Sequence, residues 1–388
     1  MKEKPLIPLS KPAISETEVN AVAEVLRSGW LVSGPKTVEF EDQLSQRFNK
    51  RSVVSVSSGT AALHLSLILA GIEKYDEVIT TPMTFAATAN VILMVGARPV
   101  FVDIDPTTWN IDPGQIEKAI TKQTRAILPV HFAGRPCNMD KINEIAARHG
   151  LKVIEDAAQA FGAFYKEKPI GSGENFVCFS FHPMKQITTI EGGAIVLPNQ
   201  DLLPLAKRLR FHGIEKDAWK TFKGIQTDVP YDVSILGYKY NMSDISAALG
   251  LAQMKRERRF AQRRKVIAHA YISGLKSVGE ITLPMKDDKD SESSWNLFHI
   301  VLDRKISRHE FMALLKQNGV ASGVYYRALH LSSLYRNLLG GLDGKFPNAE
   351  RFSDQAVLLP IYPKMSDEQV QAVIAAIKKS LKQMKKSA

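Results

Sequence analysis

Cysteine is nearly absent from this chain of 388 residues, which contains only Cys137 and Cys178. Two cysteines without a CxxC spacing support neither a disulfide framework nor a zinc ribbon. We therefore expect both thiols to stay reduced, as they do in the cytoplasm. The nine histidines include no HExxH motif or other paired spacing, so the sequence predicts no metal site.

Long uncharged runs are equally scarce, and the amino terminus lacks the apolar segment of a secretory signal. Only residues 78–97 reach the length of a membrane span without a charge. Pro82, four threonines and Asn90 argue against a span. The better interpretation is a strand end, a loop, and a buried helix capped by Thr84 and ended at Gly96. We expect a soluble cytoplasmic protein that does not bind membranes.

Acidic residues are too few to balance the basic ones, which leaves a formal net charge of +11. Seven Lys or Arg and one Glu lie within residues 255–265, and five Lys lie within 378–388, so these two segments hold the whole surplus. A nucleic-acid binder usually spreads its basic residues over a groove or stripe. We therefore interpret both segments as solvated helix faces and expect no nucleic-acid partner.

The first two thirds of the chain alternate between short β-branched runs and helical patterns. A capping box at Ser15 and Glu18 opens the first expected helix. Strands are then expected at 53–56, 99–103, 126–130, 152–154, 176–181 and 194–197, with helices at 60–70, 113–120 and 139–149. The alternation predicts βαβ units and a largely parallel sheet with both faces covered.

The pattern changes after Ser243, where one long helix is expected to run through the basic segment towards Leu275. A strand at 297–302, a helix at 308–318 and a last helix capped by Ser366 should follow. A chain of this length exceeds the ~250 to 300 residues at which one core usually divides. We predict an N-terminal arm (1–15), a large domain (16–250) and a smaller α+β domain (251–388).

The segment SSGTAALHLSLILAG, residues 57–71, follows a strand and opens a helix. The small residues Ser58, Gly59 and Thr60 leave backbone N–H groups free at the helix N-terminus, where the helix dipole also favours an anion. A phosphate could bind there, although an ordinary turn with Ser or Gly capping explains the pattern equally well.

Two ionisable residues follow apolar strands of the same predicted sheet. Asp156 stands at the edge where open α/β folds place their ligands. It is either a helix N-cap over Ala157 and Ala158 or a carboxylate that holds a buried cation. Lys185 follows the strand that ends at Phe181. Burial would lower the pKa of this lysine and free its amine for Schiff-base chemistry, whereas a solvent-exposed turn lysine would have a structural role at most.

An anion cradle, a carboxylate and a lysine at strand ends are together what pyridoxal phosphate needs. The cradle would hold the phosphate, and Lys185 would form the Schiff base. Asp156 would keep the pyridine nitrogen protonated, so that the ring can accept electrons from a substrate carbanion. The sequence therefore predicts pyridoxal phosphate as the cofactor.

With these motifs the sequence resembles the DegT/DnrJ/EryC1/StrS sugar aminotransferases, a family of fold type I pyridoxal-phosphate enzymes. The resemblance covers nearly the whole chain, through GWLVSGPK, SGTAALH, PVFVDID, AILPVHFAG, VIEDAAQAFG, SFHPMK, GYKYNMSDISAALGLAQ and LLPIYPKMS. It implies an α/β fold, with a large domain around a mostly parallel sheet and a smaller C-terminal α+β domain. It also implies homodimers with shared active sites.

The resemblance assigns roles to individual residues. Lys185 and Asp156 would be the catalytic residues, as Schiff-base lysine and pyridinium partner. The other cofactor contacts would be Phe85 stacked on the ring, Gln159 beside O3′, Gly59, Thr60, Ala61 and Ser180 at the phosphate, and Asn241 reaching the phosphate from the second subunit. Lys239 and Arg327 are candidates for binding a diphosphate-linked substrate. Arg327 is the stronger one, because a guanidinium fork suits phosphate, although a salt bridge within the small domain would explain it too.

The implied reaction is transamination of a nucleotide-linked 4-keto sugar with L-glutamate as donor, for bacterial surface polysaccharide or lipid A modification. GYKYN, FHG at 211–213 and YYRALH at 325–330 favour a UDP-4-keto pentose. Gln159 departs from this pattern, since enzymes for that sugar carry His there. UDP- or GDP-linked 4-keto-6-deoxy hexoses are therefore the alternative substrates.

Two rival functions are disfavoured. In the same fold, 3-dehydratases carry His in place of the Schiff-base lysine, whereas this chain has Lys185. A non-enzymatic, cofactor-binding regulator would need an added DNA-binding domain, for which an arm of ~15 residues leaves no room.

Overall fold

The computed structural model of the chain describes residues 6–214 and 232–387, and it is built around a seven-stranded sheet. The strand order is β1-β9-β8-β5-β4-β2-β3. Strand β9 runs antiparallel to β1 and β8, and the remaining neighbours pair in parallel. The prediction of a mainly parallel central sheet is therefore confirmed.

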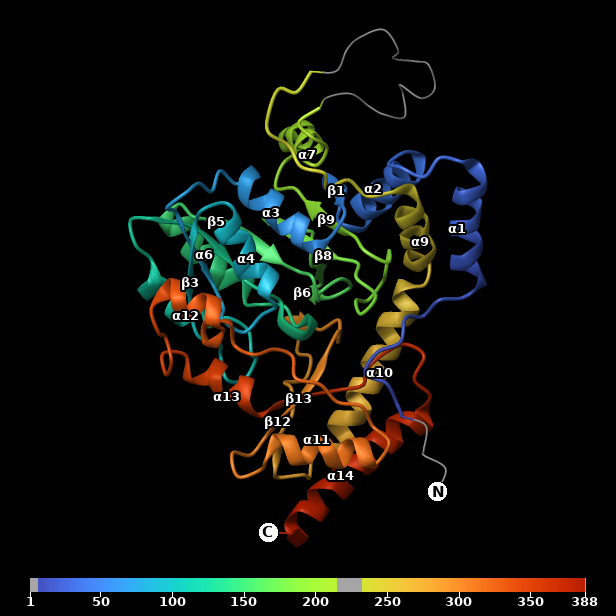
Figure 1. Cartoon of the computed structure of the whole chain (residues 1–388), viewed down its shortest axis with the longest axis vertical. Coiled ribbons are helices and arrows are strands. Elements are labelled where there is room, and N and C mark those ends of the chain that lie inside the picture. Colours follow the sequence, from blue (N-terminus) through green and yellow to red (C-terminus); the bar gives the residue numbers. More distant parts are fainter. Residues whose placement is uncertain (1–5, 215–231, 388) are drawn as a thin grey trace.

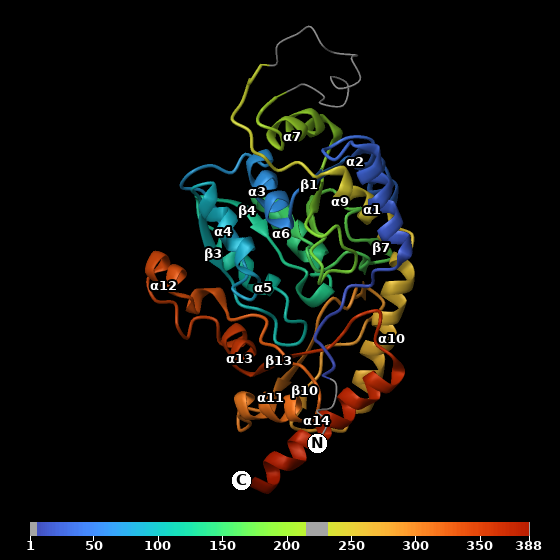
Figure 2. The same cartoon turned by 45° about the vertical axis from the view of Figure 1, so that its right-hand side comes forward.

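The central strands lie close to their expected positions. They are β1 (Val53–Val56), β2 (Glu77–Thr80), β3 (Arg98–Phe101), β4 (Thr124–Leu128), β5 (Lys152–Asp156), β8 (Phe176–Ser180) and β9 (Gly193–Val196). Most of their residues are buried, because helices cover both faces of the sheet (Figures 1 and 2). Their carboxyl ends, apart from that of β9, meet at one edge of the sheet.

Two groups of helices cover the sheet. One apolar core joins it to α3 (Gly59–Leu69), α4 (Ala86–Met94) and α7 (Leu203–Leu209). The opposite face packs against α2 (Pro35–Arg47), α5 (Pro113–Ile116) and α6 (Met139–His149). At the margin, α1 (Glu16–Ser28) lies beside α9 (Asp244–Met254) (Figure 1). The 3₁₀ helices are η1 (Glu117–Ala119), η2 (Phe132–Gly134), η3 (Gln200–Leu202) and η4 (Leu329–Leu331).

A second, antiparallel sheet lies below the first in Figure 1 and is formed by β10 (Ile281–Thr282), β12 (Phe298–Leu302) and β13 (Ala356–Leu359). Its core includes α10 (Glu257–Leu275), α11 (Arg308–Gln317) and α14 (Asp367–Ser387). A small sheet of β6 (Phe164–Tyr165), β7 (Lys168–Pro169) and β11 (Ser291–Glu292), with helices α12 (Ser333–Leu339) and α13 (Pro347–Gln355), completes the described elements. The domain limits at residues 15 and 250 stay predictions, and residues 1–5 of the predicted arm lie outside the described ones.

The expectation of one helix from Ser243 to Leu275 is wrong. Lys255 and Arg256 form a turn that separates α9 from α10. At this break the Arg256 guanidinium donates to both carboxylate oxygens of Glu18, at 2.8 and 2.9 Å, and to the Ser15 hydroxyl. These contacts with the start of α1 outweigh the local helix preference of the basic segment.

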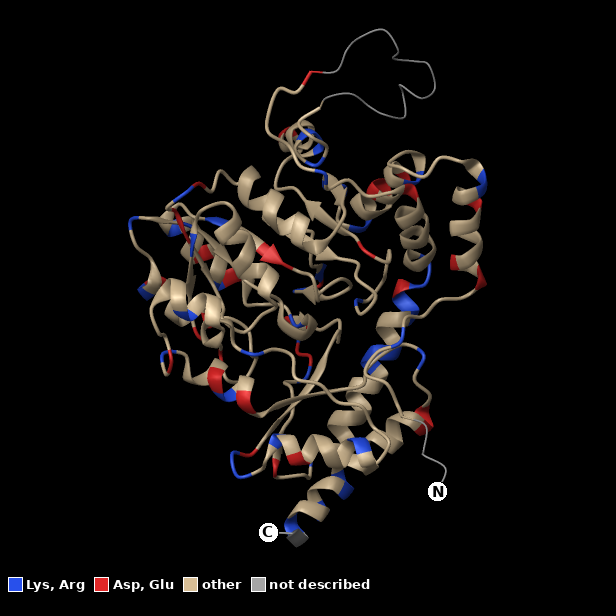
Figure 3. Ribbon diagram, viewed as in Figure 1, with Lys and Arg blue, Asp and Glu red and all other residues tan. Residues whose placement is uncertain are grey.

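The basic segment is only partly a solvated helix face, contrary to expectation. Arg264 is 2% exposed, and its Nη1 donates to the carbonyls of Trp295, Asn296 and Ile361. Arg256 is paired with Glu18, whereas Arg258 and Arg259 are exposed. Figure 3 shows Lys and Arg (blue) gathered along the upper half of α10.

The predicted cap of α4 is also wrong, because Phe85 and not Thr84 is its N-cap residue. The Thr84 hydroxyl lies 2.7 Å from that of Thr88, one turn further on. Residues 78–97 form β2, a loop and α4, as expected in place of a membrane span. Among the described helices, none combines the length and apolar composition that a membrane crossing requires.

Candidate active site

The carboxyl edge of the central sheet collects the residues that sequence patterns single out. Asp156 ends β5, Ser180 ends β8, and Lys185 lies in the turn after β8. Residues Gly59 to Ala61 open α3, directly after β1. The structure thus brings the lysine, the carboxylate and the helix N-terminus to one edge, since the parallel strands β1, β5 and β8 all end there.

Lys185 has the electrostatic surroundings of a reactive amine. Burial lowers the pKa of this lysine to about 8, and the nearby Asp156 carboxylate opposes that change. The backbone N–H of Lys185 donates to the His182 carbonyl at 2.8 Å, which closes the turn. About one tenth of the amine is therefore neutral, and so nucleophilic, at pH 7, far more than for an ordinary lysine.

Asp156 is 5% exposed and is not a helix cap, because no helix follows β5. Its Oδ1 accepts the Ala158 N–H at 3.1 Å, and its Oδ2 accepts the Thr88 hydroxyl at 2.7 Å. Burial raises the pKa of this carboxyl, while the Thr88 and Ala158 donors and the Lys185 charge act against the rise. Of the two alternatives for Asp156, a buried carboxylate beside a cation agrees with this geometry.

The start of α3 forms the expected cradle. The Ser58 hydroxyl is the N-cap and accepts the Ala61 N–H at 3.0 Å. The N–H groups of Gly59 and Thr60 have no acceptor among residues 6–214 and 232–387. A Cβ on Gly59 would lie 2.7 Å from the Ser180 Cβ, so only glycine lets the helix approach the end of β8 so closely. An anion fits here, and the two free N–H groups are its donors.

Two further predicted cofactor contacts are Gln159, whose amide nitrogen is available as a donor, and Phe85, whose ring is exposed. Gln159 is buried, and its Oε1 accepts the Ala133 N–H at 2.8 Å, which leaves Nε2 as the available donor. Phe85 is 57% exposed at the start of α4, an unusual position for a large apolar ring. Its centroid lies 5.8 Å from that of Tyr326. An aromatic cofactor would cover a ring exposed in this way.

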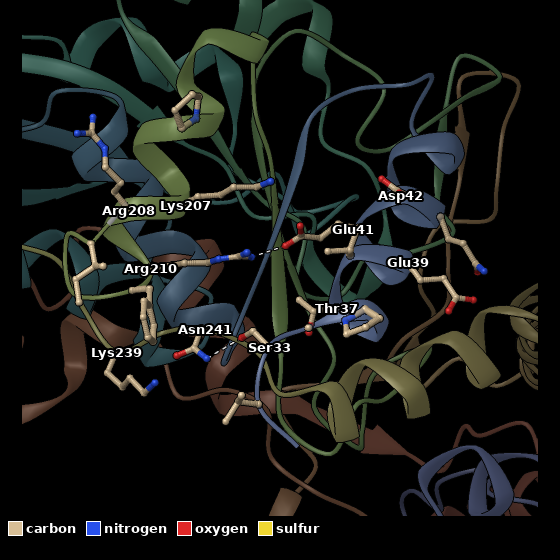
Figure 4. Close-up of a pocket in the computed structure, with 18 of the residues that line it drawn as sticks. Ser33, Thr37, Glu39, Glu41, Asp42, Lys207, Arg208, Arg210, Lys239 and Asn241 are labelled. Carbon is tan, nitrogen blue, oxygen red and sulfur yellow. Dashed lines mark hydrogen bonds and ion pairs between the residues drawn. The ribbon is translucent and has the colours of Figure 1, made fainter. Parts of the chain in front are cut away.

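Asn241 and Lys239 line a different place, a cleft of about 1150 Å³ between α2 and the segment from α7 to Ile214 (Figure 4). Neither Lys185 nor Asp156 lines this cleft. The Asn241 amide donates to the Ser33 hydroxyl at 2.8 Å, and its Oδ1 is buried and has no hydrogen-bond partner among residues 6–214 and 232–387. The Lys239 Nζ lies 4.5 Å from the centre of the Phe211 ring.

Arg327 is exposed and has no salt bridge to any residue in the described ranges, so the alternative of an ion pair within the small domain does not hold there. It directly follows Tyr326, whose burial and proximity to Asp156 raise the pKa of the phenol. The segment that carries Arg327 thus reaches the neighbourhood of Asp156.

Sequence reasoning gave no role in the site to three residues near Asp156. Thr88 of α4 donates to Asp156, and the hydroxyl of Thr84, just before α4, contacts that of Thr88. Tyr326 approaches Asp156 from the segment before η4. The signal for the threonines was their four-residue spacing in an otherwise apolar run. Within the described residues, no group of three or more His, Cys, Asp or Glu is placed to hold a metal ion.

A mainly parallel α/β sheet with a lysine, a buried carboxylate and an anion cradle at its carboxyl edge is the arrangement of a fold type I pyridoxal-phosphate enzyme. The comparisons with known proteins narrow this class. The chain belongs to the DegT/DnrJ/EryC1/StrS aminotransferase family, whose model matches residues 12–378. It is therefore a sugar aminotransferase that uses pyridoxal phosphate.

Two curated relatives are 39% identical to the chain. The spore coat polysaccharide biosynthesis protein SpsC of Bacillus subtilis (strain 168) aligns over 385 residues, 98% of each chain. The UDP-4-amino-4-deoxy-L-arabinose--oxoglutarate aminotransferase of Shewanella sediminis (strain HAW-EB3) aligns over 379 residues, 96% of this chain and 97% of the relative. Among solved structures, Spr1654 from Streptococcus pneumoniae, in PLP and PMP forms, has a TM-score of 0.90 at 34% identity, covering 97% of this chain and 99% of its own.

Proposed function

We propose that the enzyme transfers an amino group from L-glutamate to a UDP-linked 4-keto pentose. The observation that carries this proposal is the full-length similarity to an aminotransferase named for UDP-4-amino-4-deoxy-L-arabinose and oxoglutarate. The product would be a 4-amino sugar nucleotide for lipid A or another bacterial surface polysaccharide.

The residues at the sheet edge can hold the cofactor and exchange protons, which are the tasks of the protein in transamination. Bound pyridoxal phosphate supplies the electron sink for the carbanion formed at the amino-bearing carbon. Lys185 would hold the cofactor covalently, and an amine with a pKa of about 8 can also exchange protons near neutral pH. Asp156 would hold a negative charge at the ring nitrogen.

The other side chains at this edge would bind and orient the cofactor. Gly59, Thr60 and Ser180 would bind the phosphate. Ala61 is a weaker candidate, because its N–H already donates to Ser58. Gln159 would donate to O3′ through Nε2, and Phe85 would stack on the ring. Apart from Ala61, each role in this assignment thus uses a donor that has no acceptor in the described structure or, for Phe85, an exposed ring.

The diphosphate of the substrate needs cationic partners beside the cofactor. Arg327 is exposed, has no salt bridge in the described part of the chain, and follows a tyrosine that lies near Asp156. Lys239 is available in the cleft of Figure 4. We propose that Arg327 binds the diphosphate and that Lys239 contributes from the second subunit.

The same proposal includes a homodimer with shared sites. Asn241 lines a cleft that Lys185 and Asp156 of its own subunit do not reach, and its Oδ1 is buried with no partner in the described part of the chain. A cofactor phosphate bound by the other subunit would give Asn241 a function there. We place the reaction in the cytoplasm, where the buried free thiols of Cys137 and Cys178 would stay reduced.

A UDP- or GDP-linked 4-keto-6-deoxy hexose is the second candidate substrate. The chain is equally similar, at 39% identity, to a spore coat polysaccharide biosynthesis protein, so a sugar for another polysaccharide stays a candidate. The deciding experiment offers UDP- and GDP-linked 4-keto sugars with L-glutamate and follows cofactor absorbance and product mass. We expect the UDP-4-keto pentose to be aminated fastest. A hexose that reacts ~tenfold faster, about 1.4 kcal/mol in transition-state binding, would overturn the pentose and leave the reaction class intact.

A further inference from the structure

Two buried hydroxyl groups and the Asp156 carboxylate form a row of consecutive hydrogen bonds. Thr84 Oγ1 lies 2.7 Å from Thr88 Oγ1, and the Thr88 hydroxyl donates to Asp156 Oδ2 at 2.7 Å. Thr88 is completely buried and Thr84 is 1% exposed. No other acceptor for the Thr84 hydroxyl lies within residues 6–214 and 232–387. The row of hydroxyls therefore begins at Thr84 and ends at the carboxylate.

The strength of the hydrogen bonds in this row depends on the charge of Asp156. With an ionised carboxylate, Thr84 donates to Thr88 and Thr88 donates to Asp156, so both buried hydroxyl protons have acceptors and the last acceptor is charged. A protonated Asp156 keeps an acceptor oxygen, so Thr88 can still donate to it, but this hydrogen bond is weaker because its acceptor is neutral. The row therefore favours the ionised carboxylate.

We propose that Thr88, oriented by Thr84, is a positioning residue that keeps the Asp156 carboxylate ionised and aimed at the cofactor ring. This inference rests on the proposed role of Asp156 as partner of the ring nitrogen. It extends that role to a group that touches neither cofactor nor substrate. Thr88 acts through Asp156 alone, since its hydroxyl contacts only Thr84 and that carboxylate in the described part of the chain.

Burial makes such support necessary. The buried position of Asp156 raises its pKa and so favours the neutral acid, which could not hold a proton on the ring nitrogen. A hydroxyl donor to the charged form acts in the opposite direction, and a second hydroxyl behind it polarises the first. The two threonines thus offset part of the free-energy cost of burying a charged carboxylate at the place proposed for the ring nitrogen.

The same turn also presents the ring that would stack on the cofactor. Phe85 follows Thr84 directly, and its carbonyl accepts the Thr88 N–H at 3.2 Å. One short segment at the start of α4 therefore positions both the stacking face and the donor to the carboxylate. A loss of the Thr88 hydroxyl should affect cofactor binding more than protein stability.

The test compares apoenzyme variants by the dissociation constant of pyridoxal phosphate. Thr88→Val removes the donor at nearly constant size and should weaken cofactor binding about tenfold, the effect of one pKa unit. Thr88→Ser keeps the hydroxyl and should bind like wild type, while Thr84→Val should give a smaller loss. The matched control is Thr80→Val, which removes another completely buried hydroxyl that donates to the Leu128 carbonyl and makes no contact with Asp156.

A pH series adds a measurement that a merely structural role would not change. Without the Thr88 donor the carboxyl pKa rises further, so cofactor binding should weaken at a higher pH than in wild type as the solution is acidified. Other titratable groups also face this carboxylate: Lys185, His131, Tyr326, Cys137 and Cys178. They are unchanged in all variants, so the difference between Thr88→Val and Thr88→Ser reports the hydroxyl alone.

Two results would overturn the inference. One is a Thr88→Val protein with the affinity and pH profile of wild type, and the other is a Thr80→Val protein with the same loss of affinity. Asp156→Asn serves as reference, because it must weaken cofactor binding if the proposed role of Asp156 is correct. Normal cofactor binding by Asp156→Asn would reject the proposed role of Asp156. If Asp156→Asn binds the cofactor weakly and Thr88→Val binds it normally, only the inference about Thr88 is rejected.

Discussion

Burial changes the pKa values of two ionisable side chains at the sheet edge in opposite directions. Burial disfavours the charged form of each, so the pKa of Lys185 falls to about 8 while that of Asp156 rises. The charge of each partner counteracts the shift of the other. Hydrogen bonds from Thr88 and Ala158 then hold the carboxylate. An amine that loses its proton more easily than an ordinary lysine, beside a carboxylate held by hydrogen bonds, is what cofactor attachment needs.

The first prediction concerns Lys185. Borohydride reduction of the purified holoenzyme should attach the cofactor irreversibly to the peptide that contains Lys185. Lys185→Ala should abolish turnover and leave the circular dichroism spectrum unchanged, because the side chain forms no salt bridge in the described structure. A label on another lysine, or full turnover by the variant, would contradict the assignment. Lys36→Ala, which alters an exposed lysine paired with Glu39, is the control.

Arg327 allows a second prediction at the same scale. Arg327→Ala should raise the KM for the sugar nucleotide at least about tenfold, the value of one charge-assisted contact, while cofactor affinity stays the same. Steady-state kinetics and a cofactor titration measure the two effects separately. Arg304→Ala removes another exposed arginine, between β12 and α11, and should leave the KM unchanged. Equal KM values for both variants would exclude Arg327 from the binding site.

At the scale of elements, one buried carboxylate joins three helices. Glu18 of α1 is 1% exposed and accepts hydrogen bonds from Gln253 of α9 and from Arg256 before α10. It also closes the capping box with Ser15. This junction explains why a turn interrupts the helix between α9 and α10, where one continuous helix was expected.

Glu18 should therefore contribute stability that depends on pH. Burial raises the pKa of this carboxyl, but the hydrogen bonds from Ser15 and Arg256 outweigh that effect, so the net pKa lies below 4.5. A depressed pKa stabilises the folded state above pH 4.5, and the contribution is lost as pH falls through the folded value. Glu18→Gln should lower the unfolding free energy by about 1 to 3 kcal/mol at pH 7.

Urea unfolding of the apoprotein at several pH values measures this effect. The difference between wild type and Glu18→Gln should shrink below pH 4.5. Glu39→Gln, in an exposed pair with Lys36, should cost no more than about 0.5 kcal/mol at either pH. A pH-independent difference for Glu18→Gln would show that the side chain acts by packing and not by charge.

At the scale of the whole molecule, the proposed active site is divided between two places. Lys185, Asp156 and the α3 cradle lie at the sheet edge, whereas Asn241 and Lys239 line the cleft beside α2. If each cofactor is bound by the edge of one subunit and by Asn241 of the other, both subunits of a symmetric dimer complete each other's sites.

Mixing two inactive variants tests this arrangement. Dimers that combine a Lys185→Ala subunit with an Asn241→Asp subunit should have one complete site. Random mixing should then restore about a quarter of wild-type activity, since half of the dimers are mixed and each has one working site of two. Lys185→Ala mixed with Asp156→Asn is the control and should recover nothing if only Asn241 crosses to the partner. No recovery from proven mixed dimers in the first combination would place Asn241 in its own subunit's site.

The sequence by itself determined the parallel sheet and, to within about two residues, the positions of its strands. Apolar β-branched runs alternate with helical patterns, and such runs are stable only when helices cover both faces of a sheet. Asp156, Lys185 and the cradle of Gly59 could be found because each lies at the end of a strand or within five residues after it. Helices α2, α7, α12 and α13 were not predicted, because short or polar segments give only a weak periodic signal.

Only the tertiary structure decided which groups surround those residues. Thr88 precedes Asp156 by 68 positions and reaches it because α4 packs on the same face of the sheet as α3. Arg264 was predicted to lie on a solvated helix face, but it is buried and donates to three carbonyls of other segments. The physical reason is that hydrogen bonds between distant segments form only after the apolar faces have packed, and local propensity contains no information on them.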